Sequence, residues 1–407
     1  MDKLDEKFSR LGTDNAPGQE VRQREGTEFQ ALLRGETLEG RPVDFSHGDV
    51  DAFPPVDNAL AVFSDGYHQG GAQAYTEYRG KAAIRHEVAK HLGTFTGSPV
   101  DAEEELIITT GTQGALFLAI AACVTRGTKV AIVQPDYFAN RKLVSFMEGE
   151  LVPVQLNYHA TRTAAGLDLD QLEAVFKSGV EVFLFSNPNN PTGVVYSREE
   201  IVRVAQLAAQ YNVTVIVDQL YSRLLYSGEQ YTHLRAQPEM NSDNLLTIMG
   251  PSKTESLSGF RLGVAFGAAR LIQRMEKLQA IIALRAAGYN QAVLRTWFNE
   301  PDGWMSQRII AHQRIRDAIL DILHAVDGVQ VRPSQAGSYL FPQLPDLVVK
   351  PEEFVRILRV QAGVTVTPGS EFGPNVTHSI RVNFSQDYGA TVQAMQRVAT
   401  LIQRYRK

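Results

Sequence analysis

The chain contains one cysteine, Cys123, among its 407 residues. A single cysteine cannot form a disulfide within the chain, and this one stands in an apolar run, where a small buried side chain is expected. The absence of disulfides fits a reducing compartment. No apolar run approaches the ~18 residues of a membrane-spanning helix, and the first residues lack the apolar core of a secretion signal. We therefore expect a soluble, cytoplasmic protein.

Basic residues are also fewer than acidic residues. The 40 lysines and arginines face 45 aspartates and glutamates, a formal net charge of −5. Nucleic-acid binding requires a clustered basic excess, so it is not expected. The glycine-rich runs of nucleotide-binding loops, G-x-G-x-x-G and G-x-x-x-x-G-K-[ST], are missing as well. We expect a small-molecule substrate, and we expect no metal site.

Between about 100 and 270, short β-rich runs alternate with helical patterns, which is typical of a parallel sheet covered by helices. A capping box of Ser197 and Glu200 begins one of these helices. Several strand candidates are continuous apolar runs, as expected for strands buried on both faces. The predicted fold is α/β, with three α/β/α layers around a mostly parallel seven-stranded sheet. The seven predicted strands are Leu106–Thr109, Val130–Gln134, Val152–Leu156, Val182–Ser186, Val213–Val217, Leu245–Met249 and Leu262–Phe266.

The length predicts more than one domain, because single cores rarely grow beyond ~250–300 residues. We expect an N-terminal arm at 1–50 that packs with the small domain, a large domain at 51–290 and a small α+β C-terminal domain at 291–407. A long helical stretch at roughly 270–325 is expected to lead into the small domain. There the patterns predict strands near 337–341, 364–366 and 379–384, and helices at about 351–362 and 388–406.

Lys253 lies in a Gly/Ser-rich turn, with Arg261 eight positions further on and a hydrophobic strand after that. Lysine amines condense with carbonyls, and burial lowers their pKa. Arginine presents a planar fork that suits phosphate. An amine beside a phosphate clamp suggests an aldehyde cofactor that carries a phosphate, which indicates pyridoxal phosphate. The pair alone is weak evidence, because most lysines are solvated surface residues.

Other predicted strands end in polar residues, and ligands of α/β sheets gather at the carboxyl ends of strands. Gly111–Gly114 offers free amides at a helix start, Tyr137 offers a ring for stacking, and the stiff turn 187–193 can hold an amide. Asp218 ends a buried strand and needs a partner, such as a protonated pyridine nitrogen. The alternatives are an ordinary turn, simple packing, and a helix cap or structural ion pair. Together, however, the set matches every face of one cofactor.

In these residues the chain resembles the class I and II aminotransferases, pyridoxal-phosphate enzymes of fold type I. The resemblance covers roughly residues 40–400. Its most specific parts are Asn-Asn-Pro-Thr-Gly at 189–193 and the Ser-Lys turn at 252–261, in register with Asp218 and Tyr221. It implies pyridoxal 5'-phosphate as cofactor, a homodimer with shared active sites, and ping-pong transfer of an amino group from an L-amino acid to a 2-oxo acid.

The resemblance also implies a role for each site residue. Lys253 would form the Schiff base and shuttle the proton, and Asp218 would pair with the ring nitrogen. Tyr221 and Asn190 would bind the phenolic oxygen. Arg381 would grip the substrate α-carboxylate, with Gly48 and Asn190 beside the substrate. The remaining cofactor contacts would come from Gly111, Thr112, Gln113, Tyr137, Ser252, Arg261 and, in the neighbouring subunit, Tyr75.

Three positions leave alternatives open. Gly250 stands where many members carry a phosphate-binding serine, so either Ser252 compensates or the phosphate loses a donor. His47 replaces a usually apolar residue and either packs against the arm or faces the substrate. Arg285, five residues before Asn290, either selects a dicarboxylate or is an ordinary helix-surface arginine.

The same cofactor frame also supports lyase, decarboxylase and oxidase reactions, because a fold does not determine a reaction. Some bacterial transcription regulators use this fold to sense effectors. They carry a DNA-binding domain before it, for which about 40 residues leave no room. The sequence therefore predicts an aminotransferase, with another pyridoxal-phosphate reaction as the alternative.

Overall fold

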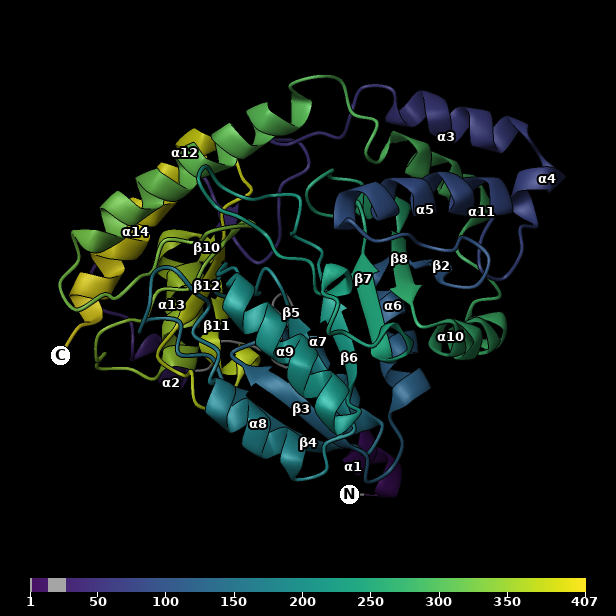
Figure 1. Cartoon of the computed structure of the whole chain (residues 1–407). Helices are drawn as coiled ribbons and strands as arrows, with labels where there is room; N and C mark the ends of the chain where they lie inside the picture. The colour runs from purple at the N-terminus through teal and green to yellow at the C-terminus, as the bar shows by residue number, and fades with distance from the viewer. Residues whose placement is uncertain (1, 14–26) are drawn as a thin grey trace.

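The computed structural model describes residues 2–13 and 27–407. Its largest sheet has seven strands in the order β2-β8-β7-β6-β5-β3-β4 (Figure 1). Strands β3 to β7 pair in parallel, whereas β8 runs antiparallel to both β2 and β7. The predicted mostly parallel seven-stranded sheet is therefore confirmed. The strands are β2 Leu106–Thr110, β3 Lys129–Gln134, β4 Glu150–Gln155, β5 Val182–Ser186, β6 Thr214–Asp218, β7 Leu245–Met249 and β8 Leu262–Gly267.

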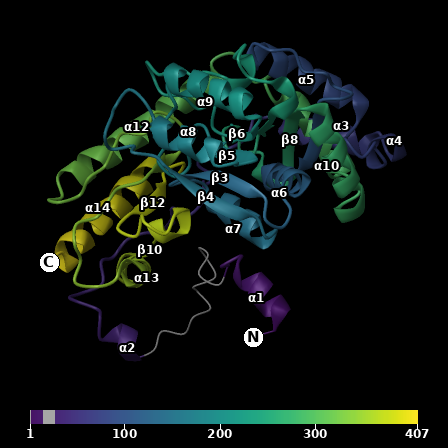
Figure 2. The same ribbon diagram turned by 60° about the horizontal axis from the view of Figure 1, so that its bottom comes forward.

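Helices cover both faces of this sheet (Figure 2). One face is covered by α8 (Leu169–Lys177) and α9 (Arg198–Tyr211), and the other by α6 (Gly111–Cys123), α7 (Phe138–Phe146) and α10 (Ala269–Ile282). In β3, Ala131 and Val133 pack into the first core, while Val130 and Ile132 pack into the second. Because alternate residues of a strand face opposite ways, a continuous apolar run is needed to fill both cores.

A separate core, apart from the two that flank the large sheet, contains the C-terminal part of the chain. A three-stranded antiparallel sheet is formed by β11 (Thr367–Pro368), β12 (Ile380–Asn383) and β9 (Tyr339–Leu340). Helices α13 (Pro351–Ala362) and α14 (Tyr388–Tyr405) occupy the predicted positions, and α12 (Trp304–His324) packs along α14 (Figure 1). The sequence did not predict β11, which is only two residues long and contains Pro368.

The N-terminal segment contacts both the C-terminal part of the chain and the helices of the large sheet, rather than the C-terminal part alone. Strand β1 (Val43–Asp44) pairs in parallel with β10 (Val364–Thr365). In contrast, α1 (Lys3–Ser9) reaches α7, where the Phe8 and Phe146 rings lie 5.7 Å apart. The domain boundaries at residues 50 and 290 stay a prediction.

The predicted helical stretch at 270–325 is interrupted. Helix α10 ends at Ile282, two short turns follow at Gly288–Gln291 (α11) and Ala292–Thr296 (η5), and α12 begins only at Trp304. Leu284 takes a positive φ of 59°, which a helix cannot contain. Gly288 lies so close to the Gln73 carbonyl that any side chain there would overlap it. This packing, invisible in the local sequence pattern, divides the stretch.

No helix among residues 2–13 and 27–407 combines the length and apolar character needed to cross a membrane.

Candidate active site

A cavity of about 230 Å³ lies where the strands of the large sheet end and the smaller sheet begins. It collects side chains from β6, from the turn after β7, from the start of α6 and from β9 and β12. Gly48, Tyr75 and Gly111 are the expected site residues outside its lining. The expected residues that line it are Thr112, Gln113, Tyr137, Asn190, Asp218, Tyr221, Ser252, Lys253, Arg261 and Arg381.

The turn after β7 brings Lys253 to the cavity. Strand β7 is fully buried between β6 and β8, so the position of the turn that follows its last residue is fixed. Within the turn, the Leu257 amide donates to the Pro251 carbonyl at 3.0 Å. The Ser252 hydroxyl donates to the Leu262 carbonyl at 3.2 Å. This bond uses the one proton of the Ser252 hydroxyl in the described structure, and a role of Ser252 toward a phosphate stays a prediction.

Gly250 is closely surrounded. A Cβ atom built on it would lie 2.8 Å from Thr112 Cγ2 and 3.1 Å from Gly263 Cα. The Thr112 methyl group thus fills the space that a serine side chain at position 250 would need. A serine at position 250 would therefore have to displace the Thr112 side chain or the Gly263 backbone.

An anion nest forms at the start of α6. Gly111 has φ +74°, and the N-cap residue Thr110 makes no side-chain capping bond, so the first helical amides stay available. A Cβ atom on Gly111 would lie 2.5 Å from Arg261 Nη2. Glycine therefore allows the guanidinium to lie directly against the helix start. Free amides, a helix dipole and an arginine together favour a phosphate group.

Asp218, the last residue of β6, presents its carboxylate to the cavity. Within the described part of the chain, the Leu220 amide donates a hydrogen bond to Asp218 Oδ1 at 3.0 Å. Burial raises the pKa of Asp218 from 3.8 to about 6, because no cation of the described residues compensates its charge. The carboxylate therefore retains capacity for a positively charged partner in the cavity.

Asp136 is a second buried carboxylate nearby, and its role differs. It accepts hydrogen bonds from the Ser186 amide at 2.9 Å and the Ser186 hydroxyl at 2.6 Å. Burial raises its pKa to about 8, although these hydrogen bonds act in the opposite direction. Asp136 links the ends of β3 and β5 and so fixes Tyr137, which it precedes. The Tyr137 hydroxyl donates to Gln113 Oε1 at 2.9 Å.

Arg381, on β12, is buried with a spare donor. Its Nη1 donates to Asn190 Oδ1 at 3.1 Å and its Nη2 to the Ser46 carbonyl at 2.9 Å. Its guanidinium carbon lies 4.4 Å from the Tyr339 ring centroid and 4.9 Å from that of Phe372. Among the described residues, Nε has no hydrogen-bond partner. A guanidinium held in this way can receive a carboxylate.

Ser46 and Tyr339 line the cavity, although the sequence did not indicate them. Gly48 was expected beside the substrate, but it lies in a neighbouring hollow instead. Ser46 contributes a backbone carbonyl, which any residue type could supply, so its sequence carried no signal. Tyr339 stands in an apolar strand, where an aromatic residue usually indicates a position in the hydrophobic core.

His47 has a partner that the sequence did not suggest. Its Nε2 lies 3.5 Å from Asp44 Oδ2, and its Nδ1 lies 2.9 Å from the Gly48 carbonyl. These hydrogen bonds, led by Asp44, raise the pKa of His47 to about 9. His47 lines the neighbouring hollow rather than the cavity, and its side chain is 65% exposed.

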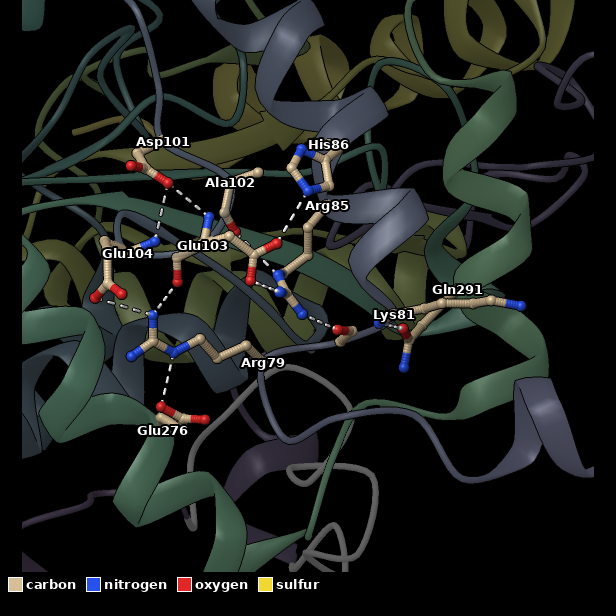
Figure 3. A network of polar contacts seen from close by, with 11 residues as sticks. Arg79, Lys81, Arg85, His86, Asp101, Ala102, Glu103, Glu104, Glu276 and Gln291 are labelled. Carbon is tan, nitrogen blue, oxygen red and sulfur yellow. Dashed lines mark hydrogen bonds and ion pairs between the residues drawn. The ribbon is translucent and has the colours of Figure 1, made fainter.

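Tyr75 lies on the surface, 82% exposed, on a loop that is firmly attached. Figure 3 shows that Arg79 reaches Glu276 of α10, at 2.7 Å, and the turn that contains Glu103. Arg85 donates to the carbonyls of Gly80 and Ala102. Arg285 lies beside Tyr75, with its guanidinium carbon 5.7 Å from that ring. Within one chain, neither Tyr75 nor Arg285 reaches the cavity.

Known proteins resemble this chain in sequence and in fold. The sequence model of the family described as aminotransferase class I and II matches residues 42–398. A crystal structure of an aspartate aminotransferase from Rhodobacter sphaeroides 2.4.1 has a TM-score of 0.94 and 62% identity, with 100% of both chains covered. An aspartate aminotransferase of Sulfolobus acidocaldarius is 27% identical over 82% of this chain and 83% of its own. Kynurenine–oxoglutarate transaminase 1 of Homo sapiens is 28% identical over 87% and 90%.

Proposed function

The chain belongs to the aminotransferase class I and II family and is a pyridoxal-phosphate-dependent aminotransferase, and from that premise we propose that the cavity around Lys253 is its active site. One observation carries this proposal. A lysine amine, a carboxylate that lacks a cation, an anion nest and a guanidinium with a spare donor all meet in one cavity.

The donor set fits pyridoxal phosphate group by group. The amides of Gly111, Thr112 and Gln113, with Arg261, would hold the phosphate. Asp218 would pair with the ring nitrogen, which supplies the positive charge that this carboxylate lacks in the described chain. Tyr221 and Asn190 would bind the phenolic oxygen, and Tyr137 would stack on the ring. Lys253 would hold the aldehyde carbon through Nζ.

The reaction divides among these residues. When bound, pyridoxal phosphate supplies an electron-accepting ring that makes the Cα–H bond of an amino acid breakable. Asp218 would keep the ring nitrogen protonated. Lys253 Nζ would take the proton from the substrate Cα as a base and later return it as an acid. Arg381 orients the substrate through its α-carboxylate, and the same residues then serve the second 2-oxo acid in reverse.

Aspartate is the amino donor that we propose. The supporting observation is the 62% identity, over the full length of both chains, to the protein described as an aspartate aminotransferase.

We also propose a homodimer, formed through an apolar face around α3 (Ala59–His68), α4 (Gly71–Ala74) and the end of α10. These elements lie together at one end of the molecule (Figure 1). Exposed apolar side chains in a group usually mark an interaction surface. This face would carry Tyr75 and Arg285 into the partner's site. The exposed residues of the face are Leu60 at 72%, Tyr67 at 57%, Tyr75 at 82%, Ile281 at 86%, Ile282 at 57% and Leu284 at 55%.

Visible absorbance of the cofactor-loaded protein tests the proposed reaction. The purified protein is loaded with pyridoxal phosphate and mixed with one amino acid at a time, without any 2-oxo acid. Aspartate is expected to convert the yellow form into the pyridoxamine form stoichiometrically, with release of oxaloacetate, and to do so faster than phenylalanine or lysine. Release of ammonia instead would contradict transamination, and a stronger response to phenylalanine would contradict the proposed donor.

A variant of Lys253 tests the proposed site. Lys253→Ala is expected to fold with unchanged circular dichroism but to lose turnover by several orders of magnitude, as expected when a covalent catalyst is removed. The exposed Lys277 on α10 offers a control, since Lys277→Ala should leave the yellow colour and turnover intact. Near-normal turnover of Lys253→Ala would exclude this cavity as the active site.

A further inference from the structure

Tyr339 is a buried residue of β9 that connects the two sides of the cavity. Its side chain is 4% exposed, and its hydroxyl oxygen lies 2.5 Å from that of Tyr221, a hydrogen-bond distance. Its ring lies against the guanidinium of Arg381, 4.4 Å away. Tyr221 follows β6 of the large sheet, whereas Tyr339 and Arg381 belong to the smaller sheet. The hydroxyl pair therefore joins the proposed cofactor side of the cavity to the proposed carboxylate side.

The backbone places this pair in a defined register. Tyr339 is paired with Asn383 of β12, two residues beyond Arg381. Just before β9, Gly337 has φ +72°, and a Cβ atom on it would lie 3.2 Å from the Tyr221 ring. Glycine thus lets the strand approach Tyr221 closely enough for the two hydroxyls to meet.

The direction of the hydrogen bond follows from the number of protons and from the function proposed above. The distance between the two oxygens allows either hydroxyl to donate. Each phenol has one proton to donate, so one hydroxyl must accept from the other. In the proposed function Tyr221 gives its proton to the phenolic oxygen of the cofactor. Tyr221 therefore accepts in the pair, and the Tyr339 O–H donates to the Tyr221 oxygen.

We propose that Tyr339 is a positioning residue of the transamination site, which donates to Tyr221 and so directs the Tyr221 proton into the cavity, while its ring holds Arg381. A hydroxyl that accepts one hydrogen bond becomes a stronger donor in the next, since chains of hydrogen bonds polarise one another. The inference rests on the proposed function above, because Tyr221 acts there on the phenolic oxygen of the cofactor. The charged and titratable groups around the pair are Arg381, Lys253, Asp218 and Tyr137.

A pH titration of the visible absorbance tests this role without measuring activity. The titration follows the proton shared by Lys253 and the phenolic oxygen of the cofactor, in wild type, Tyr221→Phe, Tyr339→Phe and the double variant. Loss of a donor makes the phenolic oxygen hold that proton more tightly, so Tyr221→Phe should raise the midpoint. Tyr339→Phe should raise it less, on the order of a few tenths of a pH unit. In the Tyr221→Phe background the Tyr339 change should have no further effect.

Tyr196 provides the matched control. It is buried, its hydroxyl has no hydrogen-bond partner in the described structure, and it does not line the cavity. Tyr196→Phe should therefore leave the midpoint unchanged. Tyr339→Leu, which also removes the ring from Arg381, should raise KM for aspartate by a larger factor than Tyr339→Phe does.

Two results would overturn the inference: an unchanged midpoint in Tyr339→Phe, or an equal shift in the presence and absence of the Tyr221 hydroxyl. Failure of the proposed function looks different. If Lys253→Ala kept the wild-type spectrum, the cavity itself would be wrongly assigned, whatever the tyrosine variants did.

Discussion

Asp218 shows at the scale of one residue how an incomplete site costs stability. Its carboxylate is enclosed without a cation, which raises its pKa from 3.8 to about 6. The folded protein without cofactor therefore binds the Asp218 proton more tightly than the unfolded chain does. Stability falls with rising pH wherever the folded state holds more protons. This contribution is thus absent below about pH 4 and becomes fully unfavourable above about pH 6.

Asp218→Asn is expected to stabilise the cofactor-free protein at pH 8 but not at pH 4. At about 1.4 kcal/mol for each pKa unit, the gain should approach about 3 kcal/mol. Urea unfolding at fixed protein concentration, at both pH values, measures it. Asp302→Asn, at an exposed position, is the control. An equal effect of Asp218→Asn at both pH values would show that charge burial is not its cause.

Arg381 makes a second prediction at this scale. Arg381→Ala should weaken the use of aspartate by about 2–5 kcal/mol in kcat/KM, the usual range for a buried charge pair that loses a partner. The loss should appear mainly in KM, because the α-carboxylate is bound before and during the reaction. Steady-state kinetics provide the measurement, with the exposed Arg198→Ala as control. Unchanged kinetics would remove Arg381 from the substrate site.

At the scale of elements, the end of β7 packs against the start of α6 without spare room. Gly250→Ala should cost about 1–3 kcal/mol in the free energy of unfolding, because its methyl group would overlap Thr112 Cγ2. Thr112→Ser removes that methyl group and should restore part of the loss in the double variant. Thermal unfolding compares the variants with Gly259→Ala, where a Cβ atom has no neighbour within 4 Å. Equal stability of Gly250→Ala and Gly259→Ala would contradict this packing argument.

The seven strands of the large sheet were predictable to within two residues at each end, because all of them except β4 are largely buried and leave apolar runs. The site residues that follow these strands were predictable for another reason: parallel strands bring their carboxyl ends to one edge of the sheet. The shared cavity of Asp218, Asn190 and Lys253 agrees with this.

Other features depend on contacts between segments far apart in the sequence. Arg223 forms ion pairs with Glu255 and Glu300. Arg308 of α12 donates to the Thr254 carbonyl, beside Lys253, at 2.8 Å. Neither the ion pairs of Arg223 nor the hydrogen bond of Arg308 leaves a local pattern in the sequence. Periodicity therefore could not reveal that α12 supports the lysine turn. The break after α10 was missed for the same reason.

At the scale of the whole molecule, Tyr75 is informative because it is exposed yet firmly held. If two copies share their sites, a mixture of Lys253→Ala and Tyr75→Ala chains should be more active than the average of the two variants alone. In each hybrid dimer one site would carry both defects and the other none. Random exchange should restore about a quarter of all sites.

Activity measured after dissociation and reassociation of the mixed chains gives the result. Sedimentation velocity of Ile281→Asp, which places a charge at an 86% exposed apolar position, should show a monomer. No regain of activity, from a mixture shown to contain hybrids, would mean that each chain completes its own site.

The pairing of β2 with β8 has a consequence for protein synthesis. Strand β2 ends at Thr110, and β8, its one neighbour in the large sheet within the described part of the chain, begins at Leu262. The anion nest at Gly111 lies against Gly263 and Arg261, so it cannot form while the ribosome is still translating the intervening segment. Strand β1 waits longer, until β10 has emerged. A growing chain therefore lacks the arginine and the glycine that complete the proposed phosphate site until residues 261–263 have been made, so capture of the cofactor would report a chain that has passed that point.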